Sequence, residues 1–173
     1  MILGWAHLLV VLVALQRLAE LARAQHNTRA LLARGGVETG AAHYPLFVLL
    51  HGGWLAALFV LTQPNPEPRW ALLALFALLQ VSRLWVIATL GPYWTTRIVT
   101  VPGATPVRSG PYRYLRHPNY LIVALEIPTL PLALGLPMAA IVFGVLNLAL
   151  LSYRIRVEDR ARSAQSRATL PIS

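Results

Sequence analysis

Long runs of apolar residues are the feature that most limits what this chain can fold into. Five such runs cover residues 2–21, 45–61, 70–90, 121–134 and 138–153. At a rise of 1.5 Å per residue they make helices of roughly 21 to 32 Å, and a bilayer core is about 30 Å thick. A backbone in lipid must satisfy its own hydrogen bonds, which helices do. The sequence therefore predicts an all-α fold, an integral membrane bundle with about five transmembrane helices.

The residue types present narrow the chemistry. Of the 173 residues, 57% are hydrophobic and 12% are charged, and this balance is outside that of a typical soluble domain. All fifteen basic residues are arginines, and the chain contains neither lysine nor cysteine. These absences exclude Schiff-base lysines, a P-loop lysine, thiolate nucleophiles and disulfides. Any chemistry must therefore use the bundle and its loops.

The arginines predict how the bundle sits in the membrane. Only Arg69 lies on one side of the predicted bundle. Twelve lie on the opposite side, between the first and second runs, between the third and fourth runs or past the fifth: Arg23, Arg29, Arg34, Arg97, Arg108, Arg113, Arg116, Arg154, Arg156, Arg160, Arg162 and Arg167. The positive-inside rule then places the N-terminus outside and the C-terminus in the cytoplasm. The first run lacks a basic start, so we expect a retained helix and not a signal peptide. Basic loops at an anionic membrane face also account for the net charge of +9 without nucleic acid.

The last two apolar runs predict a helical hairpin. Only a short Gly-Leu-Pro segment, residues 135–137, joins them, and such a turn brings the two outer ends to the same membrane level. Arg116, His117 and Tyr120 at one end should then face Arg154, Glu158 and Asp159 at the other. Carboxylates can accept hydrogen bonds from ribose hydroxyls or an amine, and aromatic rings can stack on a base. The alternative is a solvated basic tail with surface ion pairs, each worth about 0 to 1 kcal/mol.

Four charged residues inside the apolar runs need an explanation. Glu126 lies roughly 9 Å into the fourth helix, where a carboxylate is costly, so it is either a functional group or the partner of a buried arginine. Pro128 and Pro131 should kink the helix beside it. Arg17 is one turn from Glu20 and should pair with it, whereas we expect Arg83 to snorkel to the interface. His43 and His51 have no third ligand at metal spacing, so no metal site is predicted.

Two stretches resemble a known family. "GPYRYLRHPNYL" (residues 110–121), followed by the hairpin and "RIRVED" (residues 154–159), is similar to the isoprenylcysteine carboxyl methyltransferase family and its phospholipid methyltransferase relatives. The preceding "YWTTRIVTVPGATPVRSGPYRY" (residues 93–114) looks like the bacterial branch. The likeness covers about the last eighty residues, and the N-terminal half agrees in layout and in "HYP" (residues 43–45).

This resemblance implies one membrane methyltransferase-like domain, residues 1–173, with its cofactor-binding core in residues 91–173. It implies transfer of the S-adenosyl-L-methionine methyl group to a lipophilic acceptor. The implied cofactor-binding residues are Tyr112, Arg116, His117, Pro118, Tyr120, Glu158 and Asp159. By position, Trp94 and Arg97 are the substrate-binding candidates, and Glu126 and Arg154 the catalytic ones. Asp159 stands where the family more usually has glutamate, and the tail lacks an F-G-x-x-Y extension that many members have, which bears on how the cofactor is covered.

The acceptor and two other functions remain open at this point. A lipid phenol or pyrone hydroxyl ranks ahead of a prenylcysteine carboxylate, in the inner membrane of a bacterium and at its cytoplasmic face. Membrane sterol reductases carry a similar R-H-P-N-Y segment, so an NADPH-dependent reductase is the alternative enzyme, although those proteins usually have more spans. A small scaffold or transport subunit is the non-catalytic alternative. The sequence does not give the oligomeric state.

Overall fold

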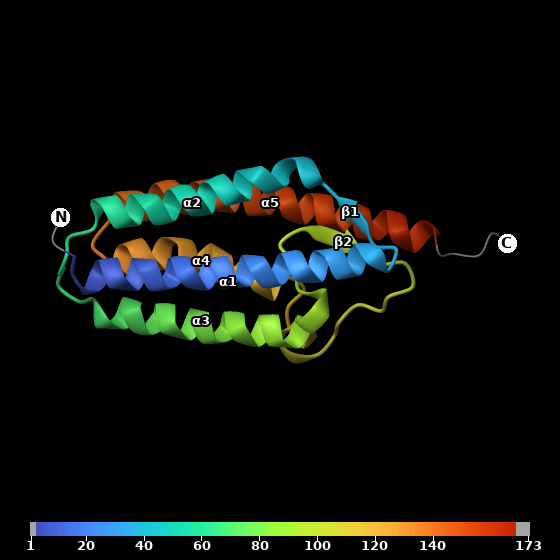
Figure 1. The fold of residues 1–173 in the computed structure, drawn as a ribbon, viewed down its shortest axis with the longest axis horizontal. Coiled ribbons are helices and arrows are strands. Elements are labelled where there is room, and N and C mark those ends of the chain that lie inside the picture. Colours follow the sequence, from blue (N-terminus) through green and yellow to red (C-terminus); the bar gives the residue numbers. More distant parts are fainter. Residues whose placement is uncertain (1–2, 169–173) are drawn as a thin grey trace.

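Five helices form one elongated bundle (Figure 1). The computed structural model describes residues 3–168, with side chains for residues 3–161. The N-terminal end of the first helix and the C-terminal end of the last lie at opposite ends of the bundle, as an odd number of passes requires. The predicted all-α membrane bundle is confirmed. Its helices are α1 (Trp5–Ala33), α2 (Tyr44–Leu61), α3 (Trp70–Leu90), α4 (Pro118–Ala133) and α5 (Pro137–Ala168).

Four of these helices are long and apolar enough to cross a membrane by length and composition. The four segments are Trp5–Ala33, Ala41–Leu61, Trp70–Tyr93 and Pro137–Ala161. Large apolar side chains on their outer faces are exposed, among them Leu8, Leu12, Leu49, Leu78 and Val145. A soluble protein rarely exposes so much apolar surface, whereas lipid covers it at no cost.

The fourth helix is the shortest of the five and packs between two others. α4 has 16 residues, or about 24 Å, and it packs against both α3 and α5. It runs unbroken through Pro128 and Pro131, where the sequence had suggested a kink. Pro131 has no N–H to donate to the carbonyl of Ile127. The indole N–H of Trp54, from α2, donates to that carbonyl instead, at 3.1 Å.

Two helices continue past the apolar runs that predicted them. α1 extends from the predicted end at residue 21 to Ala33, and α5 from residue 153 to Ala168. The last helix is therefore longer than its apolar run, residues 138–153, had indicated. Arginine, alanine, glutamine and glutamate in these extensions are good helix formers, so an apolar run shows where the membrane ends and not where the helix ends. Both extensions project from the same end of the bundle (Figure 1).

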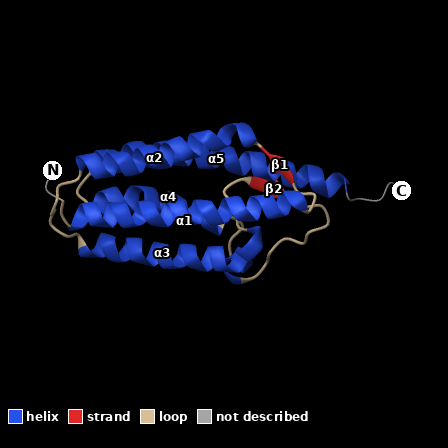
Figure 2. Ribbon diagram, viewed as in Figure 1, coloured by secondary structure: helices blue, strands red, loops and turns tan. Residues whose placement is uncertain are grey.

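A small β-ribbon, absent from the sequence prediction, ties two loops together at that end. β1 (Val37–Thr39) and β2 (Ile98–Thr100) pair antiparallel, with Glu38 opposite Val99 (Figure 2). The ribbon thereby links the α1–α2 loop to the α3–α4 connection. Three short 3-10 turns complete these loops: η1 (Ala41–His43), η2 (Gly91–Tyr93) and η3 (Gly110–Arg113).

The main hydrophobic core lies in the half of the bundle away from the ribbon. It contains Val10 of α1, Trp54 and Leu58 of α2, Phe76 of α3 and Leu130 of α4, all less than 5% exposed. Close packing of this kind fixes the relative positions of the helices. The ribbon half is packed less completely, and the cavities lie there.

Candidate active site

Two adjoining cavities in the ribbon half of the bundle share part of their lining. The first, which we call the bundle cavity, has a volume of about 340 Å³ and lies among the helices. Most of its lining is apolar: Ala14, Leu18, Leu21, Phe47, Val48, Leu55, Val123 and Leu151. Such a lining suits a hydrocarbon group.

The second cavity, the loop cavity, has a volume of about 500 Å³ and lies under the α3–α4 connection. Residues 93–95, 97–101 and 104–108 line one side of it, and the opposite side is formed by the start of α4 with Arg154 and Glu158 of α5. This lining contains many polar and charged groups. The α3–α4 connection thus covers the loop cavity. From the sequence, the cover had been expected in a tail extension that this chain lacks.

Four residues line both cavities: Thr95, Asn119, Tyr120 and Arg154. We call these four residues the shared wall. A ligand in the bundle cavity and a ligand in the loop cavity would each contact it. The shared wall is therefore the place where two ligands of different polarity can meet.

A chain of hydrogen bonds orders the shared wall. Arg154 Nε donates to the Tyr120 hydroxyl at 2.9 Å, and that hydroxyl donates to a carboxylate oxygen of Glu158. The Arg154 guanidinium also lies 5.2 Å from the centre of the Phe47 ring. These contacts join the start of α4 to the α5 extension, as the hairpin prediction required.

A second set of contacts joins the same two segments. Arg116 Nη2 lies 3.1 Å from Asp159 Oδ1, and His117 Nε2 lies 3.7 Å from the same oxygen. The His117 ring stacks on the Tyr120 ring, with centroids 5.3 Å apart. Because the Arg116 side chain is 68% exposed, its ion pair contributes little stability. Both stacked rings belong to the start of α4 and line the loop cavity, so the stacking orders that side of the cavity and does not itself reach α5.

The structure brings together most of the residues that the sequence singled out. Eight of them line the loop cavity: Trp94, Arg97, Tyr112, Arg116, His117, Tyr120, Arg154 and Glu158. Asp159 lies directly behind this lining through its contacts with Arg116 and His117. Pro118 occupies the first turn of α4, where a residue without an N–H is well tolerated. Their roles toward a ligand stay predictions.

Trp94 and Asn119 present polar atoms that have no partner among the described residues. The Trp94 indole N–H and the Asn119 amide oxygen are both buried and make no hydrogen bond there. Asn27 of the α1 extension holds Trp94 in place by donating to its carbonyl at 2.8 Å. Buried polar groups are normally satisfied, so this donor and this acceptor fit a polar ligand. The sequence analysis missed Asn119, although it lies inside the motif that carried the resemblance.

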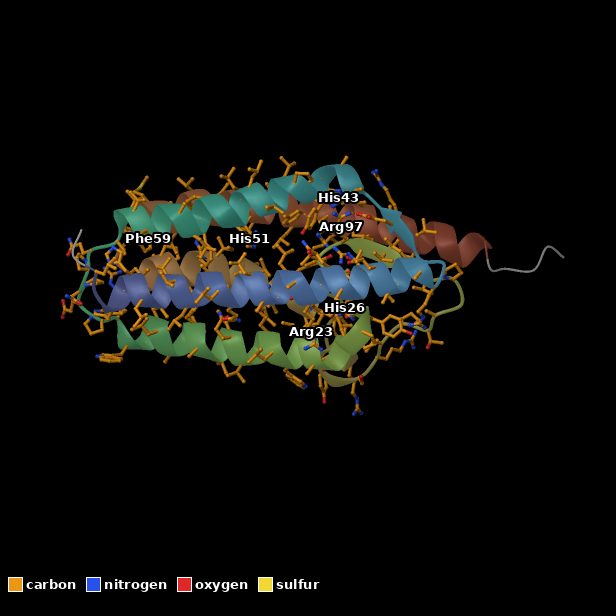
Figure 3. The ribbon with its side chains drawn as sticks, in the orientation of Figure 1. Arg23, His26, His43, His51, Phe59 and Arg97 are labelled. Atoms are coloured by element: carbon orange, nitrogen blue, oxygen red, sulfur yellow. The ribbon has the colours of Figure 1, made fainter. Side chains whose placement is uncertain are left out.

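Arg97 fixes the ribbon beside the loop cavity. Its guanidinium lies 3.0 Å from Glu38 on the opposite strand and 4.8 Å from the centre of the Tyr44 ring (Figure 3). A charge pair and a cation–π contact thus tie the α3–α4 connection to β1 and to α2. Arg97 is engaged with protein groups, and its predicted contact with substrate stays a prediction.

Glu126 lies in a buried ionic cluster that we define by Arg17, Glu20, Arg83 and Glu126. One Glu126 oxygen accepts hydrogen bonds from Arg17 at 3.0 Å and from Arg83 at 3.1 Å. The other oxygen accepts a hydrogen bond from the side-chain amide of Gln80 at 2.8 Å. The Glu126 side chain is 2% exposed and lines neither cavity. The sequence analysis had left two roles open for Glu126, a functional group or the partner of a buried arginine, and the structure shows the pairing with arginine. A catalytic role for Glu126 stays a prediction.

Arg83 corrects one expectation. It is 7% exposed and does not snorkel to the interface, because Glu20 lies 2.8 Å from its guanidinium and Glu126 3.1 Å. The predicted Arg17 and Glu20 pair is confirmed at 2.9 Å. Two arginines and two glutamates cancel in charge, and such a buried set requires all its members because removing one leaves an unpaired charge.

The fold and the site together define an integral membrane protein that holds a polar pocket and an apolar pocket side by side. The model of the isoprenylcysteine carboxyl methyltransferase family matches residues 72–163, which include most of α3, all of α4, the shared wall and both ends of the hairpin. The chain belongs to this family, which implies methyltransferase activity in general. The family resemblance drawn from the two motifs is confirmed.

Two bacterial proteins are similar to the chain over most of its length. "Uncharacterized protein YpbQ" of Bacillus subtilis (strain 168) is 37% identical over 158 residues, which are 89% of this chain and 94% of that protein. An "Uncharacterized protein" of Haemophilus influenzae (strain ATCC 51907 / DSM 11121 / KW20 / Rd) is 26% identical over 144 residues, 79% of this chain and 83% of that protein. No solved structure matches the chain significantly.

Proposed function

We propose that the protein transfers a methyl group from S-adenosyl-L-methionine to an oxygen of a lipophilic acceptor at the cytoplasmic membrane face. The observation that carries this proposal is the shared wall, at which an apolar cavity between helices meets a polar cavity under loops. A lipid and a water-soluble cofactor need such an arrangement, because they arrive from different phases. Family membership supports the transferred group.

The loop cavity suits the cofactor. Trp94 supplies a buried donor and Asn119 a buried acceptor, both without a partner among the described residues. Glu158 supplies a carboxylate for ribose hydroxyls or an amine, and the stacked His117 and Tyr120 rings supply an aromatic surface. When bound, S-adenosyl-L-methionine supplies an electrophilic methyl group. The residues around it need only bind and orient.

The bundle cavity suits the acceptor, whose reacting oxygen would lie at the shared wall. The Arg154 guanidinium there favours an anionic oxygen, and Tyr120 holds Arg154 in place through its hydroxyl. The apolar lining excludes water from the reacting oxygen and strengthens the electrostatic attraction. Positioning of this kind accounts for much of the rate in a reaction between two held groups.

Among acceptors we place a lipid phenol or pyrone hydroxyl ahead of a prenylcysteine carboxylate. Both similar proteins come from bacteria, and bacteria generally lack prenylated CaaX proteins. An acidic hydroxyl on a ring with an alkyl chain fits an apolar cavity that has a guanidinium at one end.

The arginines support an orientation in the bacterial inner membrane. Arg23, Arg29 and Arg34 lie in the α1 extension and at its end, and Arg154, Arg156 and Arg160 lie in the α5 extension. Both extensions project at the ribbon end of the bundle (Figure 1). The positive-inside rule makes this end cytoplasmic, so the N-terminus is outside, the C-terminus is in the cytoplasm, and the loop cavity opens toward the cytoplasmic pool of cofactor.

Ligand titration of the purified protein tests the cofactor. We expect S-adenosylhomocysteine to bind and NADPH not to bind. Binding of NADPH alone would favour the sterol-reductase alternative, and binding of neither would favour a scaffold or transport subunit. An untargeted lipid comparison of cells with and without the protein, grown with a labelled methyl donor, then identifies the acceptor as the labelled lipid that the protein adds.

A further inference from the structure

His51 directs a hydrogen-bond acceptor at the bundle cavity. It lies on α2, one helical turn after Phe47, and lines the cavity (Figure 3). Its Nδ1 is 2.9 Å from the carbonyl oxygen of Phe47. A carbonyl oxygen only accepts, so Nδ1 carries the proton and Nε2 carries a lone pair in the neutral ring. Nε2 has no hydrogen-bond partner among residues 3–161.

The groups that face His51 favour its neutral form. Arg17 and Arg83 line the same cavity, as does Arg154 at the shared wall. A further positive charge would be costly in an apolar cavity that already holds guanidinium groups. Glu20 is the carboxylate in this lining, and Arg17 and Arg83 both engage it. His51 therefore presents Nε2 to the cavity as an acceptor.

Other polar groups deep in the cavity do not compete for a donor. Arginines donate and do not accept. One Glu20 oxygen accepts from Gln16 and Arg83, and the other from Arg17 and Arg83. The neighbouring positions on α2 are apolar, Val48 and Leu55. A hydroxyl group on the occupant of the cavity would find its acceptor at His51.

The position of His51 indicates which part of the acceptor it contacts. Phe47 lies against the Arg154 guanidinium at 5.2 Å, close to the proposed reacting oxygen. His51 is four residues further along α2, which is roughly 6 Å deeper. That step is comparable to the separation of two hydroxyl oxygens on one six-membered ring.

We propose that His51 Nε2 accepts a hydrogen bond from a second hydroxyl of the acceptor and so selects lipids whose ring carries two hydroxyl groups. One hydroxyl is methylated at the shared wall, and the other is held by His51. This inference rests on the proposed lipid O-methylation. It makes His51 a specificity-determining residue, distinct from the groups that hold the cofactor.

A matched pair of acceptors tests the inference. The probes are 5-pentadecylresorcinol and 3-pentadecylphenol, which have the same chain and differ by one hydroxyl. We expect the wild-type protein to have a kcat/KM about tenfold higher for the resorcinol, mainly through a lower KM, as for one added hydrogen bond. His51→Phe keeps an aromatic ring without the acceptor, so the ratio should fall to about one. His51→Gln keeps a carbonyl acceptor and should restore part of the preference.

Each outcome separates the inference from the proposed function. Equal kcat/KM values for the two lipids in the wild-type protein would overturn the role of His51 and leave phenol methylation standing. A tenfold preference that persists in His51→Phe would also overturn it. Methylation of neither lipid, by protein that binds S-adenosylhomocysteine, would overturn the role of His51 and the phenol acceptor, and leave methyl transfer to a pyrone hydroxyl or a prenylcysteine carboxylate standing. Affinity for S-adenosylhomocysteine in each variant shows that the fold is retained.

Discussion

The Nε of Arg154 donates to the Tyr120 hydroxyl at 2.9 Å, across the open end of the hairpin formed by α4 and α5. Both residues line the bundle cavity and the loop cavity. The hydroxyl in turn donates to Glu158, so one phenol connects a guanidinium to a carboxylate. Tyr120 thereby positions one group proposed for the acceptor and one proposed for the cofactor.

Replacing Tyr120 by phenylalanine should uncouple these two groups. We expect Tyr120→Phe to lower kcat about tenfold, because Arg154 and Glu158 each lose a hydrogen-bond partner of about 1 to 1.5 kcal/mol. Steady-state kinetics with a labelled methyl donor measures this. Tyr114→Phe is the matched control, since the Tyr114 side chain is 76% exposed and lines neither cavity. A wild-type kcat in Tyr120→Phe would contradict the positioning role.

His117→Ala and Glu158→Ala should each weaken cofactor binding. Removing one partner from a largely buried site costs about 1 to 3 kcal/mol, so Kd for S-adenosylhomocysteine should rise by roughly 5- to 150-fold. Isothermal titration calorimetry gives both values. Arg156→Ala is the control, because Arg156 is an exposed residue of the same helix and lines neither cavity. Unchanged affinity in both variants would remove the proposed cofactor pocket.

A single variant distinguishes a structural role of Glu126 from a catalytic one. Glu126→Gln leaves Arg17 and Arg83 with less negative charge around them, and breaking a buried ion pair costs about 3 to 5 kcal/mol. We expect a lower midpoint of thermal unfolding and unchanged affinity for S-adenosylhomocysteine. A structural role predicts a wild-type kcat per folded molecule, and a catalytic role predicts a reduced one. Glu67→Gln, at an exposed loop position, controls for the loss of one carboxylate.

Arg97 and Glu38 should act together on cofactor affinity. Their ion pair closes the ribbon beside the loop cavity, yet Arg97 is 40% exposed, so the stability effect should stay below about 1 kcal/mol. We expect Arg97→Ala to raise Kd for S-adenosylhomocysteine severalfold. In a double-mutant cycle with Glu38→Gln the two effects should not add. If the two effects on Kd were fully additive, the ion pair would not hold the α3–α4 connection over the loop cavity.

The bundle was predictable from sequence because a membrane helix requires a run of apolar residues long enough to cross the bilayer. The start of α3 at Trp70 and its end at Leu90 agree with the apolar run to the residue. The helix extensions and the β-ribbon were not predictable in this way. Residues 22–33 show no apolar run, and the strands Val37–Thr39 and Ile98–Thr100 are too short and too far apart in sequence to signal pairing.

The site was predictable in part, for a related reason. Tyr120, Arg154 and Glu158 were expected to meet because the hairpin returns its two ends to one level, and they do. The partners of Arg83 were not expected, since nothing local in sequence connects it with Glu20 or Glu126. His51 was read only as a metal-ligand candidate, because its orientation depends on packing between α1 and α2.

The uninterrupted course of α5 has a mechanical consequence. Pro137 and Glu158 lie on one helix about 32 Å apart, with no break in the helix between the hairpin turn and the carboxylate at the loop cavity. A tilt of only about 2° would displace Glu158 by roughly 1 Å relative to a fixed α4. Helix tilt follows the thickness of the surrounding lipid. A change in lipid thickness that tilts α5 would therefore move Glu158 relative to Tyr120.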